Sequence, residues 1–423
     1  MNMSFPSTRT KAGEALETDR RQSPGPLKIL TLSSVFPNPR EPDHGTFIRY
    51  RMQAVSKLAS VKVIAPVAAV DYSHPRGDWF GNRSLAAQRQ DGAIEVLHPR
   101  WLFPPFGTPL NGVCMYLRLA GFAAQVRRRY PFDLLDVHFG FPDGQAAGML
   151  ARRLGCPFVL TLRGNEPIFG RSGAGRNAMS AAFRKASRVL AVSEELRRYA
   201  IELGVDPGRV RTVPNGIDAE FFYPRDRAAC RSRHGIAPGA RVILSAGRLV
   251  EAKGHHYIIR ALRRMKDRGV DARLLLAGGP CREDRFEQEI RQTVRDLELE
   301  QEVVFLGHIA REQMVELMSA ADVLCLASFA EGWPNVVHEA QACGAPVVAT
   351  AVGGVPDMIP GEQYGYMVPV KDADALAAAL QQALARSWDR KAISQWGRSR
   401  SWEQVAKEVV NQMHQAVAEY VRD

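Results

Sequence analysis

Short apolar runs recur along most of the chain and alternate with longer stretches of mixed polarity. In the first half they occupy residues 28–33, 61–66, 133–137, 158–162, 189–192 and 210–213, and in the second half residues 242–246, 273–279, 303–307, 322–327 and 346–349. Many of them are rich in Val, Ile and Leu, which is typical of strands buried on both faces of a parallel sheet. The pattern predicts an α/β protein with two doubly wound, Rossmann-like domains that face one another.

Polar residues and glycines follow several of these runs in the first half. Gly45 ends the loop after the first run, ahead of a predicted helix. His138 follows the third run, and Arg163, Asn165 and Glu166 follow the fourth. In an open parallel sheet the carboxyl ends of the strands lie along the edge where ligands bind. We therefore expect these residues to line a crevice, although a lone histidine or loop glycine is more often structural.

Two cations stand at the corresponding place in the second half. Arg248 and Lys253 follow the run at 242–246 and lie at a predicted turn from strand to helix. Such a turn can bind a diphosphate, because charged donors there act together with the free amide groups of a helix start. A pair of this kind that stands alone is usually ordinary surface charge.

The most informative stretch runs from residue 331 to 350 and predicts a loop, a short helix and a strand. Pro334 suits the first helical turn, and Gly344 suits the left-handed residue that ends a helix. Glu331 then lies in the loop, and Glu339 lies about two turns along the helix. Two carboxylates at this edge can accept hydrogen bonds from the hydroxyls of a hexose and a ribose. Two glutamates at an arbitrary spacing would usually be solvent-facing.

The spacing Glu-x7-Glu, with the sequence Ala-Cys-Gly at 342–344 and the glycine pair at 353–354, resembles the nucleotide-binding half of the family-four retaining glycosyltransferases. Those proteins have the GT-B fold. Bacterial exopolysaccharide and teichuronic-acid transferases also share the sequence Glu-Gly-Trp-Pro-Asn, found here at 331–335. The resemblance extends from about Leu27 to the C-terminus.

The resemblance implies a division of the chain and a role for individual residues. It implies an acceptor domain (27–215), a donor domain (216–400) and a C-terminal helix (401–423) that packs back on the first domain. Residues 1–26 are rich in Ser, Thr, Pro and charge, which predicts a disordered tail. The catalytic candidates are Glu331 for the sugar, His138 for positioning the hexose, and Arg248 and Lys253 for the leaving diphosphate. The implied donor contacts also include Glu339 for the ribose, Gly307 and Ile309 for the nucleobase, and Gly45, Gly332, Asn335 and Val336. Arg163, Asn165 and Glu166 are the acceptor-side candidates.

The formal net charge of +11 is distributed unevenly. Residues 27–213 contain 26 Lys and Arg against 14 Asp and Glu, whereas residues 214–423 contain 26 against 28. The positive half can meet nucleic acid, an anionic membrane or a phosphorylated substrate. Because no nucleic-acid motif accompanies it, we expect no nucleic-acid partner.

The stretch 101–126 is apolar and carries a single charge, Arg118, ahead of the basic cluster at 127–129. It predicts either a helical pair of the core or an interfacial element at headgroup depth. No run is long enough to span a bilayer, residues 1–26 lack the apolar core of a secretory signal, and the six cysteines have no paired spacing. These features predict a cytoplasmic protein, and attachment to the inner face of the membrane is the open alternative.

We therefore predict a retaining, metal-independent hexosyltransferase of surface or exopolysaccharide biosynthesis. It would use a nucleotide-diphosphate sugar as co-substrate, with no cofactor and no metal, and a lipid-linked saccharide as acceptor. One alternative is a nucleotide-sugar 2-epimerase of the same fold. The other is a non-catalytic sugar-nucleotide-binding subunit of a polysaccharide assembly complex. The base, the hexose, the acceptor linkage and the oligomeric state are left open by the sequence.

Overall fold

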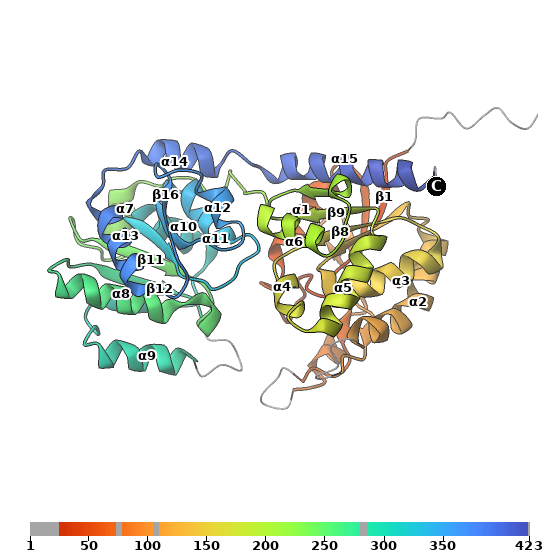
Figure 1. Ribbon diagram of the computed structural model, residues 1–423, viewed down its shortest axis with the longest axis horizontal. Coiled ribbons are helices and arrows are strands. Elements are labelled where there is room, and N and C mark those ends of the chain that lie inside the picture. Colours follow the sequence, from red (N-terminus) through yellow and green to blue (C-terminus); the bar gives the residue numbers. More distant parts are fainter. Residues whose placement is uncertain (1–24, 73–77, 105–109, 280–285, 422–423) are drawn as a thin grey trace, which may run out of the picture.

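Two largely parallel sheets, each covered by helices, lie side by side in the computed structural model, which describes residues 25–72, 78–104, 110–279 and 286–421 (Figure 1). The predicted N-terminal tail lies almost wholly outside these described residues. Each sheet alternates with helices in the order expected for a doubly wound fold, so the predicted α/β class is confirmed.

The first sheet has the strand order β10-β9-β8-β7-β1-β2-β5-β4, and its pairs are parallel except β4 with β5. Its strands are β1 (Lys28–Leu32), β2 (Ser60–Ile64), β4 (Gln88–Asp91), β5 (Ile94–Leu97), β7 (Leu134–His138), β8 (Phe158–Leu162), β9 (Arg188–Ala191) and β10 (Val210–Thr212). A separate pair consists of β3 (Val67–Ala68) and β6 (Arg100–Trp101). The helices are α1 (Thr46–Val55), α2 (Asn111–Arg129), α3 (Gln145–Leu154), α4 (Glu166–Phe169), α5 (Gly173–Lys185) and α6 (Glu194–Glu202). The strand order changes direction between β1 and β7, so the loops that leave these two strands open a crevice.

The second sheet has the order β13-β12-β11-β14-β15-β16, with all pairs parallel. Its strands are β11 (Val242–Ala246), β12 (Arg273–Ala277), β13 (Val303–Gly307), β14 (Val323–Leu326), β15 (Val347–Thr350) and β16 (Gly365–Val368). The helices are α7 (Arg227–Arg233), α8 (His255–Asp267), α9 (Phe286–Asp296), α10 (Arg311–Ala320), α11 (Asn335–Ala342), α12 (Val355–Met358), α13 (Ala373–Ala385) and α14 (Arg390–Gly397). The direction here changes between β11 and β14, which places their exit loops next to each other.

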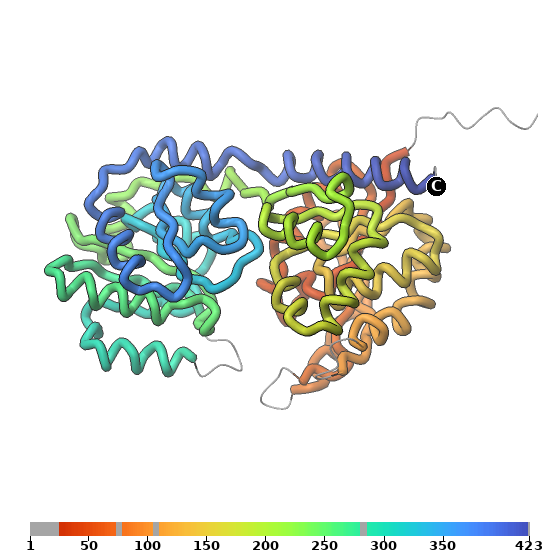
Figure 2. Tube along the Cα trace, in the orientation of Figure 1, coloured from red at the N-terminus to blue at the C-terminus, as the bar shows by residue number. Residues whose placement is uncertain are grey.

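The last helix, α15 (Trp402–Tyr420), returns to the first domain and lies along its upper face (Figures 1 and 2). Ser401 and Gln404 form a reciprocal capping box at its start. Its buried side chains, among them Trp402, Val409 and Met413, belong to the same core cluster as β1, β2 and α1. The chain therefore passes between the domains twice, and the two passages lie side by side, because the amide of Ile217 donates to the carbonyl of Arg400 at 2.9 Å.

The helical pair predicted within 101–126 is not what the structure shows. The described part of this stretch forms the end of β6 and one helix, α2, while residues 105–109 lie outside the described part. The sequence does not contain a second apolar period long enough for another helix, since Pro104 and Pro109 interrupt it. No helix in the described ranges has both the length and the apolar content needed to cross a bilayer.

Candidate functional site

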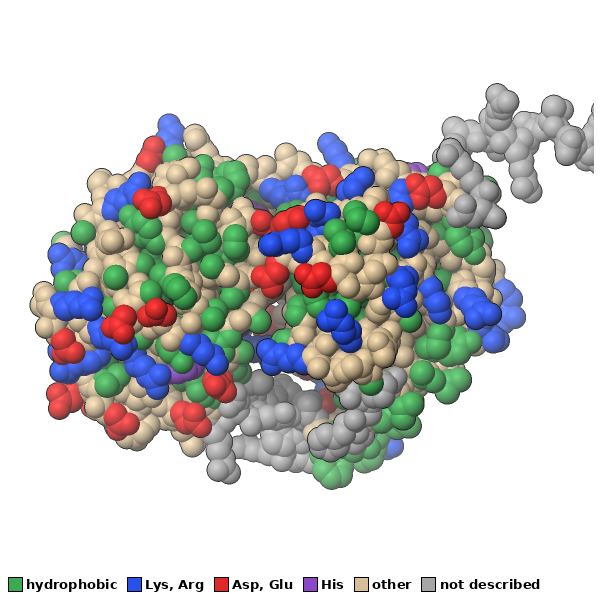
Figure 3. Space-filling view, viewed as in Figure 1, with side chains coloured by type: hydrophobic (Ala, Val, Ile, Leu, Met, Phe, Trp, Pro, Cys, Tyr) green, Lys and Arg blue, Asp and Glu red, His purple; other side chains and the backbone are tan. Residues whose placement is uncertain are grey.

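The exit loops of the two sheets meet across the crevice, which is hollowed into the surface between the two halves in Figure 3. The carbonyl oxygen of Arg163, after β8, lies so close to Gly332 that a Cβ there would stand 1.9 Å from it. Two hydrogen bonds cross nearby, from the amide of Gly353 to Glu195 at 2.8 Å and from the amide of Glu194 to Asp357 at 3.0 Å. The two domains are therefore in direct contact along one side of the crevice.

An ion pair joins the exits of β11 and β14 at the point where the second sheet changes direction. Nζ of Lys253 lies 2.5 Å from Oε1 of Glu331, and the two side chains are 26% and 11% exposed. Arg248 precedes Lys253 in the same turn and is exposed. The structure thus brings together three of the four catalytic candidates, although they are up to 83 positions apart in sequence.

His255, which the sequence pattern did not single out, supports this turn from its buried side. Its Nε2 contacts the carbonyl oxygen of Arg248 at 3.2 Å, and its Nδ1 contacts the hydroxyl of Ser245 at 3.3 Å. The ring is 1% exposed, and burial lowers its pKa to about 4, so it is neutral at physiological pH. A neutral ring can donate from Nε2 to the carbonyl while it accepts at Nδ1 from the hydroxyl. Gly254 follows with a positive φ of 65° and packs against the carbonyl of Ala327.

Glu339 extends from α11 into a small cavity between the domains. The cavity is also lined by Thr46, Tyr50, Asp218, Phe222, Arg311, Asn335 and Trp402. Burial raises the pKa of Glu339 to about 7, and the charge of Arg311 opposes this rise. Among the described residues no hydrogen bond or ion pair engages this carboxylate, so it has free acceptor capacity. Gly307, at the end of β13, has a positive φ of 68° and is exposed, as expected of a residue on the same sheet edge.

His138 is the fourth catalytic candidate, and it lies at the end of β7 with no exposed surface. Its Nε2 lies 3.2 Å from Oδ2 of Asp136, and its Nδ1 lies 2.9 Å from Nη2 of Arg163. Burial lowers its pKa to about 4, with the positive charges of Arg163 and Arg51 acting in the same direction. Both ring nitrogens are therefore occupied, and contact between this ring and a hexose stays a prediction.

The acceptor-side candidates differ from one another in exposure. Asn165 is exposed, whereas Arg163 and Glu166 are 7% and 1% exposed. The carboxylate of Glu166 accepts hydrogen bonds from the amides of Gly140, Arg163 and Gly164 at 3.0, 3.1 and 2.7 Å. Direct contact of Arg163 or Glu166 with an acceptor would therefore require them to leave these partners, because their charged groups point inward.

Gly45 is the residue that caps the start of α1, and it has a positive φ of 75°. A Cβ at this position would lie 1.8 Å from the carbonyl oxygen of Val35. The glycine is thus required by the packing of its own loop, and a role in donor binding is a separate prediction.

The sequence Asp372-Ala373-Asp374 lies at the start of α13. Asp372 caps this helix by accepting from the amides of Asp374 and Ala375 at 3.0 and 2.9 Å, and Asp374 pairs with Arg264 at 2.6 Å. Within the described residues, no cluster of three His, Cys, Asp or Glu side chains is suited to hold a metal ion.

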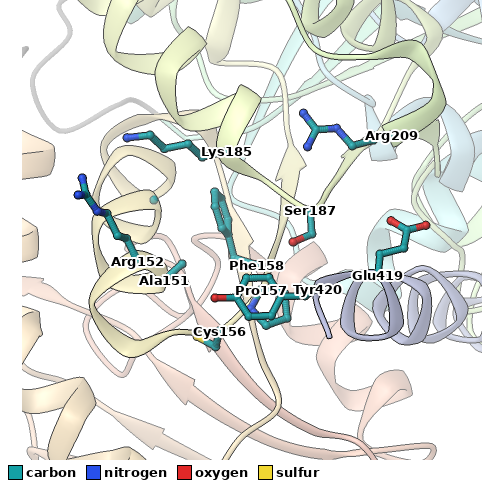
Figure 4. A pocket seen from close by; sticks show the side chains of 11 residues that line it. Ala151, Arg152, Cys156, Pro157, Phe158, Lys185, Ser187, Arg209, Glu419 and Tyr420 are labelled. Atoms are coloured by element: carbon teal, nitrogen blue, oxygen red, sulfur yellow. The ribbon is translucent and has the colours of Figure 1, made fainter. Parts of the chain in front are cut away.

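A cavity of about 500 Å³ lies away from this site (Figure 4). It opens beside the amino ends of β8 and β9, at the edge of the first sheet opposite the crevice, and is lined by Arg152, Lys185, Arg209 and Glu419 among others. Cations at the ends of helices are expected there, because the negative end of the helix dipole favours them.

Comparison with known proteins covers both domains. The family described as "Glycosyltransferase Family 4" matches residues 75–221, and the family described as "Glycosyl transferases group 1" matches residues 226–400. A D-inositol 3-phosphate glycosyltransferase of Kribbella flavida is 31% identical over 315 residues, which cover 70% of this chain and 74% of that protein. A Bacillus subtilis protein assigned provisionally to teichuronic acid biosynthesis as a glycosyltransferase is 28% identical over 372 residues, covering 84% of this chain and 88% of that protein.

Solved structures with similar folds extend over nearly the whole chain. Sucrose-phosphate synthase from Thermosynechococcus elongatus has a TM-score of 0.73 at 20% identity, covering 93% of this chain and all of that chain. HepE of Anabaena in complex with UDP has a TM-score of 0.70 at 19% identity, covering 92% of this chain and all of that chain. These likenesses establish the GT-B architecture, with two Rossmann-like domains on either side of a crevice.

Proposed function

The chain belongs to the family-four glycosyltransferases, and on this basis we propose that it moves a hexose, with retention, from a nucleotide-diphosphate sugar to a hydroxyl of a saccharide. The proposal rests on the arrangement of charge at the exits of β11 and β14, where the second sheet changes direction. Lys253 pairs with Glu331, Arg248 lies in the same turn as Lys253, and the unpartnered carboxylate of Glu339 lines a cavity between the domains. This combination suits a diphosphate flanked by two sets of sugar hydroxyls.

The ion pair between Lys253 and Glu331 has a consequence for donor binding. A diphosphate gives Lys253 a second anionic partner, and a hexose hydroxyl gives Glu331 a donor, so the bound sugar nucleotide can take the place of the direct pair. The residues then hold the two groups on either side of the bond that breaks. This arrangement favours the leaving diphosphate electrostatically as negative charge develops on it.

The proposed reaction exchanges one bond at the anomeric carbon. The bond from that carbon to the phosphate oxygen breaks, a bond to the acceptor oxygen forms on the same face, and the leaving phosphate oxygen takes the proton of the acceptor hydroxyl. Lys253 and Arg248 stabilise the diphosphate, and no protein nucleophile is required. We propose that the reaction needs no metal.

A screen of sugar nucleotides tests the proposal. UDP, GDP and ADP sugars are added in a thermal-shift measurement, where a ligand at 100 times its dissociation constant stabilises the protein by about 2.7 kcal/mol. The stabilising donor is then incubated with and without a lipid-linked saccharide acceptor. We expect nucleotide diphosphate release that depends on the acceptor. Conversion of the donor alone to an epimeric sugar would favour the epimerase, and binding without any conversion would favour the non-catalytic subunit.

We further propose that the acceptor is lipid-linked and that the first domain meets the inner, anionic face of the cell membrane. Leu102 after β6, Leu110 just before α2 and Leu117 within α2 are 57%, 58% and 69% exposed. Arg128 and Arg129 are also exposed at the other end of this helix. Each cation near an anionic surface contributes about 1 kcal/mol, and exposed leucines add apolar area.

The structure separates Arg127 from its two neighbours. Its guanidinium donates to the carbonyl oxygen of Leu154 at 2.5 Å and stands over the ring of Phe132. Arg127 therefore has a structural role, and a test of membrane attachment should leave it in place. We expect the wild type to co-sediment with anionic vesicles at low salt and the Arg128→Gln, Arg129→Gln double variant to bind less. Failure of the wild type to bind such vesicles would reject attachment and leave the transferase proposal standing.

A further inference from the structure

A continuous line of hydrogen bonds runs from the core of the first domain to the first helical residue of α11 in the second. Beyond the contacts of His138 with Asp136 and Arg163, Nη1 of Arg163 donates to Oδ1 of Asn215 at 2.7 Å. Nδ2 of Asn215 then donates to Oδ1 of Asn335 at 3.0 Å. The five residues come from β7, the exit of β8, the connection between the domains and α11, and we call them the interdomain relay.

The chemistry of Arg163 fixes the direction of every bond in the interdomain relay. A guanidinium has donors only, so it requires an unprotonated Nδ1 on His138 and an oxygen on Asn215. The proton of the neutral ring must then lie on Nε2, facing Asp136. The amide nitrogen of Asn215 must likewise face Asn335, which accepts. One buried side chain thus determines both a histidine tautomer and two amide orientations.

The charges around Arg163 are balanced without a contribution from His138. The buried cations Arg51 and Arg163 are matched by Asp136 and Glu166, all of which are at most 7% exposed. Buried arginines are costly unless they are paired and hydrogen-bonded. An arginine is therefore better explained here by its geometry than by stability, because an apolar side chain of similar volume would avoid the cost of burying a charge.

The backbone beside Arg163 meets the loop that carries Glu331. Gly164 has a φ of 122°, and a Cβ there would lie 2.6 Å from Cα of Gly332. The side chain of Arg163 therefore reaches the second domain through Asn215, while its backbone touches that domain directly. Both contacts require the domains to be close together.

We propose that Arg163 and Asn215 are positioning residues, which lock the closed crevice and set the orientation of His138 on one side and Asn335 on the other. The proposal rests on the transferase function proposed above. If the two domains move apart, the bond between Asn215 and Asn335 must break, so that closure would complete the interdomain relay. Neither Arg163 nor Asn215 needs to touch the donor or the acceptor.

A double-mutant cycle tests whether the interdomain relay acts as a unit. We expect Asn215→Ala and Asn335→Ala each to lower kcat about tenfold or more, since misplacement of a reacting group by about 1 Å can cost a hundredfold. The double variant should be no slower than the slower single variant, because either change breaks the same bond. Asn177→Ala, an exposed change on α5, is the matched control. Losses that multiply in the double variant would overturn the proposal.

The pH dependence of kcat is a measurement that a purely structural role of Arg163 would leave unchanged. His138 is faced by Asp136 from β7, Arg163 from the exit of β8 and Arg51 from α1. Removing the positive charge of Arg163 should raise the pKa of His138, so Arg163→Met should move the acid limb of the kcat profile to higher pH. Arg163→Lys keeps the charge and should move it less. An unchanged acid limb in Arg163→Met would count against the assignment.

Small-angle X-ray scattering separates failure of this proposal from failure of the transferase function. With a saturating concentration of the nucleoside diphosphate of the donor that the thermal-shift screen identifies, the radius of gyration should be larger in Asn215→Ala and Asn335→Ala than in the wild type. This comparison needs no turnover. If the wild type transfers no sugar but still has a smaller radius of gyration than the two variants, the transferase function is rejected and the interdomain link is retained. Equal radii together with wild-type kcat in both variants would reject the link.

Discussion

The contact between Gly332 and Arg163 makes the closed crevice sensitive to a single methyl group. Gly332 does not have a positive φ, so replacing it with alanine introduces no backbone strain. Its Cβ would nevertheless stand 1.9 Å from the carbonyl oxygen and 2.6 Å from the carbonyl carbon of Arg163. Ordinary contact begins at about 3.4 Å, so the two segments must separate by about 1.5 Å.

A displacement of this size is large compared with the tolerance of catalysis. Misplacement of a reacting group by about 1 Å can cost a hundredfold in rate, so we expect Gly332→Ala to lower kcat about a hundredfold. The affinity for the nucleoside diphosphate of the donor should change little, because the proposed phosphate contacts, Arg248 and Lys253, belong to the same domain as Gly332. Melting temperature should also stay close to that of the wild type, since the added methyl group lies at the domain boundary and outside both cores.

The assay measures initial rates of nucleotide release with the donor identified by the thermal-shift screen, together with the affinity for the nucleoside diphosphate of that donor by calorimetry. Gly121→Ala is the control, because a Cβ at Gly121 in α2 meets no atom within 4 Å. That change should leave kcat unaltered and stabilise the helix by about 0.5–1 kcal/mol. Wild-type turnover in Gly332→Ala would refute the closed arrangement as the active one. A loss of nucleoside diphosphate affinity as large as the loss of kcat would show instead that Gly332 acts through the donor.

Three further predictions concern the donor site. Arg248→Ala and Lys253→Ala should each reduce turnover about a hundredfold or more, the scale for loss of one electrostatic stabiliser, with unchanged circular dichroism; wild-type rates in both would reject the phosphate assignment. Donor affinity should fall as pH drops through about 7, because the carboxylate of Glu339 becomes protonated there and loses acceptor capacity. Calorimetry from pH 6 to 8 should show this dependence, and Glu339→Gln should abolish it. Activity should survive EDTA, and loss of activity that magnesium or manganese restores would contradict metal independence.

The helices and strands could be predicted where the apolar runs were continuous and had distinct ends. The strands expected at 158–162, 242–246 and 303–307 are found with those bounds, and Gly344 ends α11 with a left-handed φ of 81°. Pro334 is one position off, because it caps α11 from outside in extended geometry and Asn335 is the first helical residue. Apolar residues that repeat every 2.0 or 3.6 positions are a local feature of the sequence, so the fold class could be predicted from them.

The interdomain relay and the contact of His255 with the turn that carries Arg248 and Lys253 could not be predicted in the same way. Arg163 and Asn215 are 52 positions apart, and Asn215 and Asn335 are 120 apart. Isolated polar residues have no period, and only the packing of two separate domains brings them together. For the same reason His255 had no visible signal, because its role depends on the carbonyl of Arg248 that it holds.

The return of α15 to the first domain sets the order in which a growing chain can mature. The core face covered by β1 and α1 is complete only when Trp402, Val409 and Met413 have been added to it. At about 5–20 residues per second, the ribosome needs roughly 10–40 s to pass from the end of β10 to the start of α15. During that interval the second domain can fold as a unit, while the first, although synthesised earlier, waits with an apolar face open. The domain that is synthesised first is therefore the one that finishes folding last.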